Sequence, residues 1–181
     1  MGQEKKEKLT KMEIDWILYD VGNSAFVLLA TTILPIYFNY LAGLEGVSEV
    51  DYLAYWGYAA SIATLLVAFI GPVCGAIADT KGYKKPIFMI CMMVGVLGCA
   101  ALAIPKSWIV FLVVFVIAKV GYSASLVFYD SMLPDITTPE RLDAVSSHGF
   151  AWGYIGSCVP FVFSLVFVPV SYTHLTLPTI A

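Results

Sequence analysis

The sequence alternates between long apolar stretches and short polar connections. Five apolar stretches lie at about residues 16–41, 53–77, 86–103, 108–129 and 145–170. A helix rises about 1.5 Å per residue, so about 20 apolar residues cross a hydrocarbon core about 30 Å thick. The pattern predicts an all-α membrane protein with five transmembrane helices, preceded by a polar arm at residues 1–15.

Composition supports a lipid environment and excludes several classes of function. Hydrophobic residues make up 60% of the chain and charged residues only 13%, and the net charge is −3. Without a basic cluster, a nucleic-acid partner is not expected. The four cysteines stand singly in apolar stretches, without the paired spacing of a metal site, and no phosphate-binding loop occurs. We therefore expect no metal and no cofactor.

Lysine and arginine are distributed unequally between the two ends of the expected spans. The arm, the 79–86 connection and the connection before the fifth span together carry Lys5, Lys6, Lys8, Lys11, Lys81, Lys84, Lys85 and Arg141. The opposite ends carry only Lys106. Basic residues near spans resist translocation, so this asymmetry predicts a cytoplasmic N-terminus.

The stretch at residues 171–181 abruptly loses the dense apolar character that precedes it. It resembles a translated sequencing-adapter read-through, and we interpret it as a non-native tail, discounting His174. A natural polar tail is the alternative.

The most specific segment is the connection between the second and third spans. Its order GAIADTKGYKKP supplies Gly75, Asp79, Lys81, Gly82, Lys84 and Lys85. Gly71 and Gly75 are expected to permit close helix approach, and Gly82 a tight turn. This segment resembles the signature loop of the major facilitator superfamily, at the same place between two helices. The resemblance implies that the chain is an incomplete N-terminal six-helix bundle of a transporter with about twelve helices.

The fifth span carries small residues at three- and four-residue spacing. They are Gly149, Gly153 and Gly156, followed by Pro160. They resemble the glycine- and proline-rich fifth-helix motif of the same superfamily. Such spacing brings helices close together, and generic packing explains it as well as a gating role does.

Two further segments carry a narrower resemblance. They are WILYDVGNSAF at residues 16–26 and YDSMLPDI at residues 129–136. Both resemble the branch that includes the autophagy-linked vacuolar amino-acid effluxer and many bacterial proteins. That branch more often has Asn-Ala at positions 130 and 131, which leaves the role of Asp130 open. The resemblance implies amino acids as the substrate and efflux as the direction.

Polar residues form a stripe on the first and on the fourth span. On each, helical offsets of three, four and eleven residues place side chains on one face. The stripes are Asp20, Asn23, Ser24 and Thr31, and Lys119, Tyr122, Ser123 and Asp130. An intramembrane lysine is costly unless it meets a partner or water. We expect Lys119 to line a central cavity and pair with a carboxylate or an anionic substrate group; a structural ion pair or a snorkelling side chain is the alternative. For Asp20 and Asn23, polar contacts between helices are the alternative.

The leading interpretation is a secondary transporter of a small solute in a bacterial plasma membrane, working by alternating access. Its partners would be the lipid bilayer, the solute and the missing C-terminal half, so that this chain alone should not transport. Proton coupling stays open. A non-transporting sensor or scaffold is the alternative from another class. An intramembrane aspartyl protease is a remote one, because Asp20 and Asp130 lack the Gly-x-Gly-Asp motif of such enzymes. We therefore do not expect an enzyme.

Overall fold

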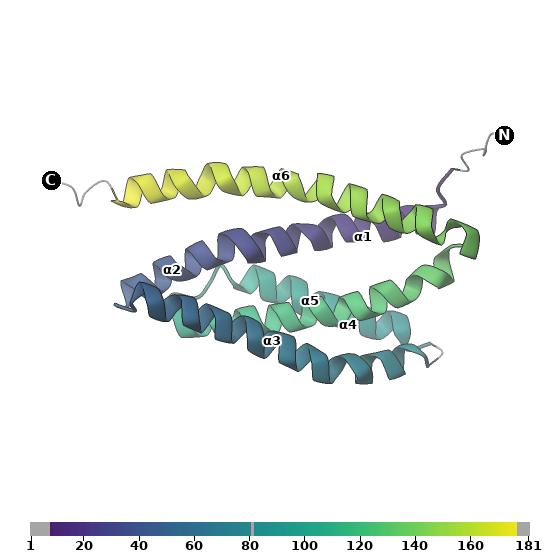
Figure 1. Cartoon of the computed structure of the whole chain (residues 1–181), viewed down its shortest axis with the longest axis horizontal. Coiled ribbons are helices and arrows are strands. Elements are labelled where there is room, and N and C mark those ends of the chain that lie inside the picture. Colours follow the sequence, from purple (N-terminus) through teal and green to yellow (C-terminus); the bar gives the residue numbers. More distant parts are fainter. Residues whose placement is uncertain (1–7, 81, 177–181) are drawn as a thin grey trace. The chain divides into compact units, whose positions relative to one another are not determined.

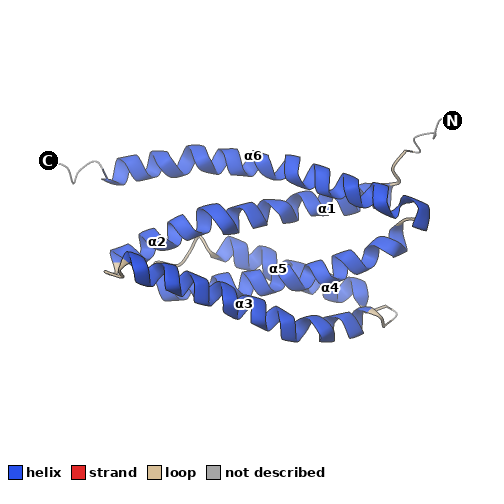
Figure 2. Ribbon diagram, viewed as in Figure 1, coloured by secondary structure: helices blue, strands red, loops and turns tan. Residues whose placement is uncertain are grey.

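The computed structural model describes residues 8–80 and 82–176, and this part of the chain forms helices and short connections without a strand (Figure 2). Within it, five helices are long and apolar enough to cross a membrane: Lys11–Leu44, Val50–Ala78, Lys84–Ala101, Trp108–Ile136 and Pro139–Val166. The predicted all-α architecture with five spans is confirmed.

The first span is interrupted near its middle. It consists of α1 (Lys11–Leu28), a π-helical turn η1 (Leu29–Ile33) and α2 (Leu34–Leu44). Pro35 is the second residue after the turn, has no N–H, and would clash with the carbonyl four residues earlier, at Thr31. A π-turn spaces the backbone more widely and accommodates this loss. The break therefore has a local cause in the sequence.

The remaining helices follow with short connections. They are α3 (Glu49–Ala78), α4 (Lys84–Ala101), α5 (Trp108–Ile136), the 3₁₀ turn η2 (Pro139–Arg141) and α6 (Leu142–Thr176). Ser48 is the N-cap of α3, and its hydroxyl accepts a hydrogen bond from the Asp51 N–H at 3.2 Å. The helix α5 continues to Ile136, beyond the expected end at residue 129. These additional turns contain Pro134. From the sequence alone, a proline at such a position predicts the end of a helix.

The chain divides into two compact units. The α1/α6 unit comprises Met1–Ala30 and Leu133–Ala181, and the α2–α5 unit comprises Thr31–Met132. In the α1/α6 unit, α1 and α6 lie side by side (Figure 1).

Aromatic side chains form the core of the α2–α5 unit. The rings of Phe38, Phe111 and Phe115 are fully buried. Phe38 stacks on Phe111 with ring centroids 6.1 Å apart, and Trp56 lies 4.4 Å from Phe115. These contacts join α2, α3 and α5 at one end of the unit. At its other end, Phe128 packs with Cys74 and Ala78.

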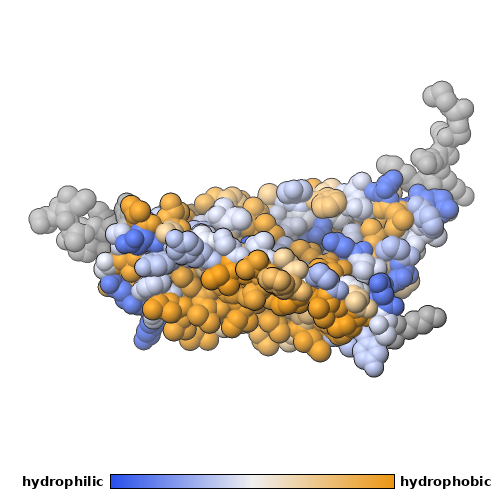
Figure 3. All heavy atoms as spheres, turned by 60° about the horizontal axis from the view of Figure 1, so that its bottom comes forward, coloured by the Kyte–Doolittle hydropathy of each residue, from blue (hydrophilic) through white to orange (hydrophobic). Residues whose placement is uncertain are grey.

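Large apolar side chains also cover the outside of the spans. Leu65, Phe69 and Val73 on α3 are all more than half exposed. Figure 3 shows such residues gathered in a broad apolar area on one face. An apolar exterior is what helices in contact with lipid tails require.

The interpretation of residues 171–181 as a non-native tail stays a prediction. Residues 177–181 lie outside the described residues, as do residues 1–7 of the arm and Lys81.

Candidate functional site

In the polar stripe of α5, Lys119 and Ser123 lie beside the face that packs on α4, whereas the backbone of Tyr122 belongs to that contact. Ala118 and Gly121 of α5 pack directly on α4, because a Cβ on Gly98 would lie 2.8 Å from Ala118 Cβ. Lys119 is displaced from Ala118 by about 100° around the helix. Lys119, Tyr122 and Ser123 are half-buried, and Asp130 is exposed. Lys119 and Ser123 are thus displaced around the helix from the α4 contact.

Lys119 stands near the middle of α5 and is the unusual charge of this stripe. Within the described residues of the α2–α5 unit, it forms no ion pair. A lysine at such a depth is stabilised by water or by an anion. Among its described residues, this unit supplies no carboxylate that pairs with Lys119.

The polar stripe of α1 turns toward α6 for part of its length. A Cβ on Gly153 would lie 2.8 Å from Ser24 Oγ and 3.1 Å from Asp20 Oδ2. Asp20 and Ser24 therefore face α6, whereas Asn23 is half-buried beside them. Thr31 lies in the π-turn η1, where the 3.6-residue register breaks. Its offset of eleven residues from Asp20 no longer ensures that both share a face.

Glycines of α6 form the other side of this contact, which we call the α1–α6 seam. It comprises Gly149, Gly153 and Gly156 of α6 and Trp16, Asp20, Val21 and Ser24 of α1. A Cβ on Gly149 would lie 2.7 Å from Trp16 Cζ3, and one on Gly156 would overlap Val21 Cγ1. The seam thus depends on the absence of side chains on α6. Pro160 lies farther along α6, where its carbonyl accepts a 2.8 Å hydrogen bond from the Ser164 hydroxyl.

The signature loop has the turn geometry that its sequence indicates. Gly82 adopts a φ of +88°, which side chains rarely tolerate. Asp79 ends α3 and is exposed, and Lys85 is exposed on the first turn of α4. Lys84 reaches across to α5, where its Nζ donates to the Ser131 carbonyl at 3.1 Å. Lys84 thereby ties the loop to the end of α5.

The close approach expected at Gly71 and Gly75 is not seen among the described residues. A Cβ at either glycine would meet no atom within 4 Å. Close approach occurs instead at Gly95, Gly98 and Gly121, which sequence reading did not single out. A Cβ on Gly121 would lie 2.7 Å from the Gly95 backbone nitrogen. These residues, with Ala118, form what we call the α4–α5 seam.

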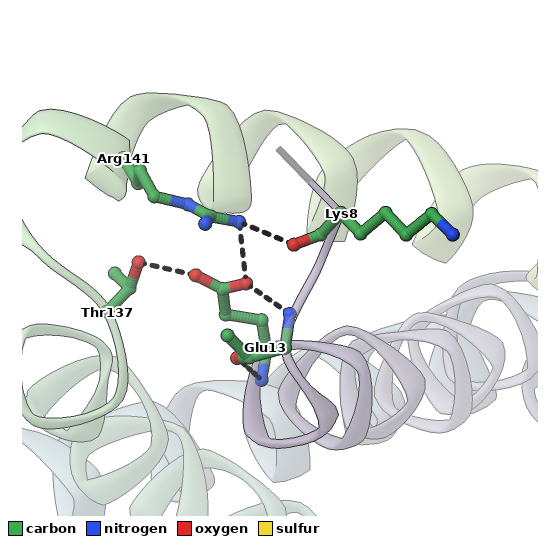
Figure 4. A network of polar contacts seen from close by, with 5 residues as sticks. Lys8, Glu13, Thr137 and Arg141 are labelled. Carbon is green, nitrogen blue, oxygen red and sulfur yellow. Dashed lines mark hydrogen bonds and ion pairs between the residues drawn. The ribbon is translucent and has the colours of Figure 1, made fainter. Parts of the chain in front are cut away.

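A buried polar cluster at the start of α1 was also not predicted from the sequence. Glu13 is 1% exposed and its Oε2 accepts from Arg141 Nη2 at 2.9 Å. Its Oε1 accepts from the Thr137 hydroxyl at 2.7 Å (Figure 4). The capping-box pattern of Thr10 and Glu13 was the available signal, because it marks a helix start. Nothing in the sequence indicated Arg141 as the partner.

An apolar, open pocket of about 310 Å³ is formed by α3, α4 and α5 of the α2–α5 unit. It is lined by Leu66, Ile70, Ile90, Cys91, Val94, Val116, Ile117, Val120, Gly121 and Ala124. Apart from the Cys91 thiol, which forms only weak hydrogen bonds, a polar solute would find no hydrogen-bonding side chain there. Among the described residues, no group of three His, Cys, Asp or Glu side chains could hold a metal ion.

Comparison with known proteins identifies the family. Residues 46–144, from the connection before α3 to the start of α6, match the family described as "Vacuole effluxer Atg22 like". The chain belongs to this family, and it is an integral multi-pass membrane protein of the major facilitator type. The resemblance to that superfamily and branch is confirmed.

A relative of Bacillus subtilis (strain 168) bears the name "Uncharacterized MFS-type transporter YxiO". The two are 39% identical over 165 residues, which cover 90% of this chain and 39% of the relative. The chain therefore spans about two fifths of the length of that relative. No solved structure matches the chain.

Proposed function

We propose that this chain is the N-terminal part of a secondary transporter that moves a small solute across a bacterial plasma membrane by alternating access. Family membership supports transport, and the printed names of the family and the relative refer to an effluxer and a transporter. Neither name points to a sensor, a scaffold or a protease. Alternating access needs a second bundle, which the remaining length of the relative would supply.

The observation that carries the substrate class is the position of Lys119. It lies in mid-span, about 100° around α5 from the Ala118 contact with α4, and forms no ion pair with the described residues of its unit. An anionic group of the solute would satisfy this charge. The carboxylate of an amino acid fits the requirement and agrees with the narrower resemblance. Tyr122 and Ser123 on the same stripe would add hydroxyl groups to the site.

The test is uptake or efflux of a labelled amino acid by the full-length transporter in liposomes. Lys119→Met should lower flux by on the order of tenfold or more, since a hydrogen bond to a charged group contributes about 1.5–3 kcal/mol. Lys119→Arg keeps the charge and should retain more flux. Lys106→Met, in the exposed connection before α5, is the matched control and should leave flux unchanged. Full flux in Lys119→Met with normal expression would overturn the assignment.

The proposed orientation places the N-terminus and the signature loop in the cytoplasm. Single cysteines introduced at Lys85 and at Lys106 test it with a membrane-impermeant maleimide. In intact cells the reagent should label only the cysteine at 106. Labelling at 85 alone would reverse the topology.

A further inference from the structure

The cluster around Glu13 lies at the start of α1, about two helical turns before Asp20, and the solute pathway proposed above does not include it. One carboxylate there joins three segments of the chain: the cap of α1, the connection after α5, and η2. Its Oε2 accepts from the Thr10 N–H at 2.7 Å and from Arg141, and its Oε1 accepts from Thr137. Both oxygens are therefore engaged.

Burial makes this cluster sensitive to the loss of either charge. Glu13 is 1% exposed and the Arg141 side chain 23% exposed. A buried carboxylate is tolerated only when a cation and hydrogen bonds compensate for its lost hydration. Arg141 supplies that cation from the turn that leads directly into α6, and its Nη2 also approaches the Lys8 carbonyl at 3.4 Å (Figure 4). The start of α1 is thus fixed to the start of α6.

The same face of α1 continues from Glu13 into the α1–α6 seam. Trp16, Asp20 and Ser24 follow Glu13 at helical offsets of three, seven and eleven residues. At the seam, each faces a glycine with no room for a Cβ. Such close packing requires α1 to keep one register against α6. The Glu13 cluster lies at the end of the seam, where it can prevent α1 from sliding along its axis against α6.

We propose that Glu13 is a positioning residue of the transport cycle, whose ion pair with Arg141 makes α1 and α6 move as one body. This inference rests on the proposed transport function. Glu13 contacts neither solute nor coupling ion; it holds Asp20 and Ser24 in register against α6 while the rest of the transporter changes conformation.

A disulfide reporter measures that register without any need for transport. Val21→Cys and Gly156→Cys are introduced after the four native cysteines have been replaced by alanine. The Cβ positions of residues 21 and 156 lie 3.3 Å apart, near the 3.5–4.5 Å or so of a disulfide. Glu13→Gln keeps the shape and the helix cap but removes the charge, and it should slow disulfide formation several-fold in membranes. Glu140→Gln, on the same turn as Arg141 but exposed, should leave the rate unchanged.

An unchanged rate in Glu13→Gln would overturn the inference even if the protein transports. A slowed rate would support the positioning of α1 even if no flux were found, in which case the proposed transport function fails by itself.

Flux through the full-length transporter then separates positioning from direct action. Glu13→Gln should lose most of its flux, and closing the 21–156 disulfide should restore it, because the covalent link replaces the ion pair. In the otherwise native protein the closed disulfide should leave flux intact. Failure of the disulfide to restore flux would assign Glu13 a direct role and overturn the inference. Inactivation of the native protein by the disulfide would also overturn it, because α1 and α6 would then have to separate.

Discussion

Two seams between helices are lined by glycine, and they use it differently. In the α4–α5 seam, glycines on both helices meet the backbone of the other: a Cβ on Gly95 would lie 3.1 Å from the Tyr122 nitrogen. In the α1–α6 seam, all the glycines are on α6 and meet side chains of α1, such as Ser24. In the first seam the two backbones lie in contact. In the second, glycines of α6 contact the side chains of α1.

Because of this difference, the two seams should respond differently when a side chain is added to one of their glycines. Helices in lipid associate through close packing and polar contacts, because lipid tails are as apolar as the side chains. Backbone cannot move aside, so the α4–α5 seam permits one arrangement. Side chains can rotate in place, so the α1–α6 seam can absorb a small added group, and Glu13 and Arg141 provide an additional tie that holds its register. We expect a Cβ added to a glycine of the α4–α5 seam to lower stability, and one added in the middle of the α1–α6 seam to alter function instead.

The largest expected effect on stability comes from removing one partner of the Glu13–Arg141 ion pair. Arg141→Met leaves the Glu13 carboxylate buried without its cation and should destabilise the protein by about 3–5 kcal/mol. The double variant Glu13→Gln/Arg141→Met removes both charges and should recover most of the loss. Thermal unfolding of the purified protein in detergent measures both. Equal stability of Arg141→Met and the native protein would show that the ion pair does not hold the seam.

A smaller but clear loss is expected in the α4–α5 seam. Gly121→Ala forces a Cβ to within 2.7 Å of the Gly95 backbone nitrogen. Overpacking of this kind costs about 1–3 kcal/mol. The matched control is Gly57→Ala in α3, where a Cβ would meet nothing within 4 Å. The control should unfold at or above the native temperature, and an equal loss in both variants would remove the distinction between seams.

The smallest expected loss of stability concerns the hydrogen bond between Lys84 and Ser131, at the end of the α4–α5 seam. Lys84→Met removes the hydrogen bond from Nζ to the Ser131 carbonyl. Because this bond is only partly buried and the backbone contact remains, the expected loss is about 0.5 kcal/mol. The same unfolding assay measures it. A loss as large as that of Arg141→Met would mean that both seams depend on charge.

The sequence predicted the spans and the signature turn because these depend on local properties. Apolar length fixes a transmembrane helix, and Gly82 is needed where φ is positive. It did not predict the π-turn. Pro35 indicates a possible helix break, but the sequence does not show that the helix accommodates it with a wider backbone turn and continues.

Contacts between distant segments were less accessible to sequence reasoning. Glycine spacing looks alike at Gly71 and Gly75, where no neighbour is found, and at Gly95 and Gly98, where α5 packs. Which glycines meet a partner depends on the placement of other helices. Arg141 was counted only as a charge for orientation, because its partner Glu13 lies 128 residues away. The placement of Lys119 in a solute pathway stays a prediction.

The most direct test of the distinction between seams is transport per folded molecule in the Gly153→Ala variant of the full-length protein. Its Cβ would press on Ser24 Oγ and Asp20 Oδ2, which can rotate away, so the unfolding temperature should stay near the native value. We predict that flux nevertheless falls strongly, because the polar face of α1 is displaced. Native flux in Gly153→Ala would contradict the account, since the α1–α6 seam would then serve packing alone.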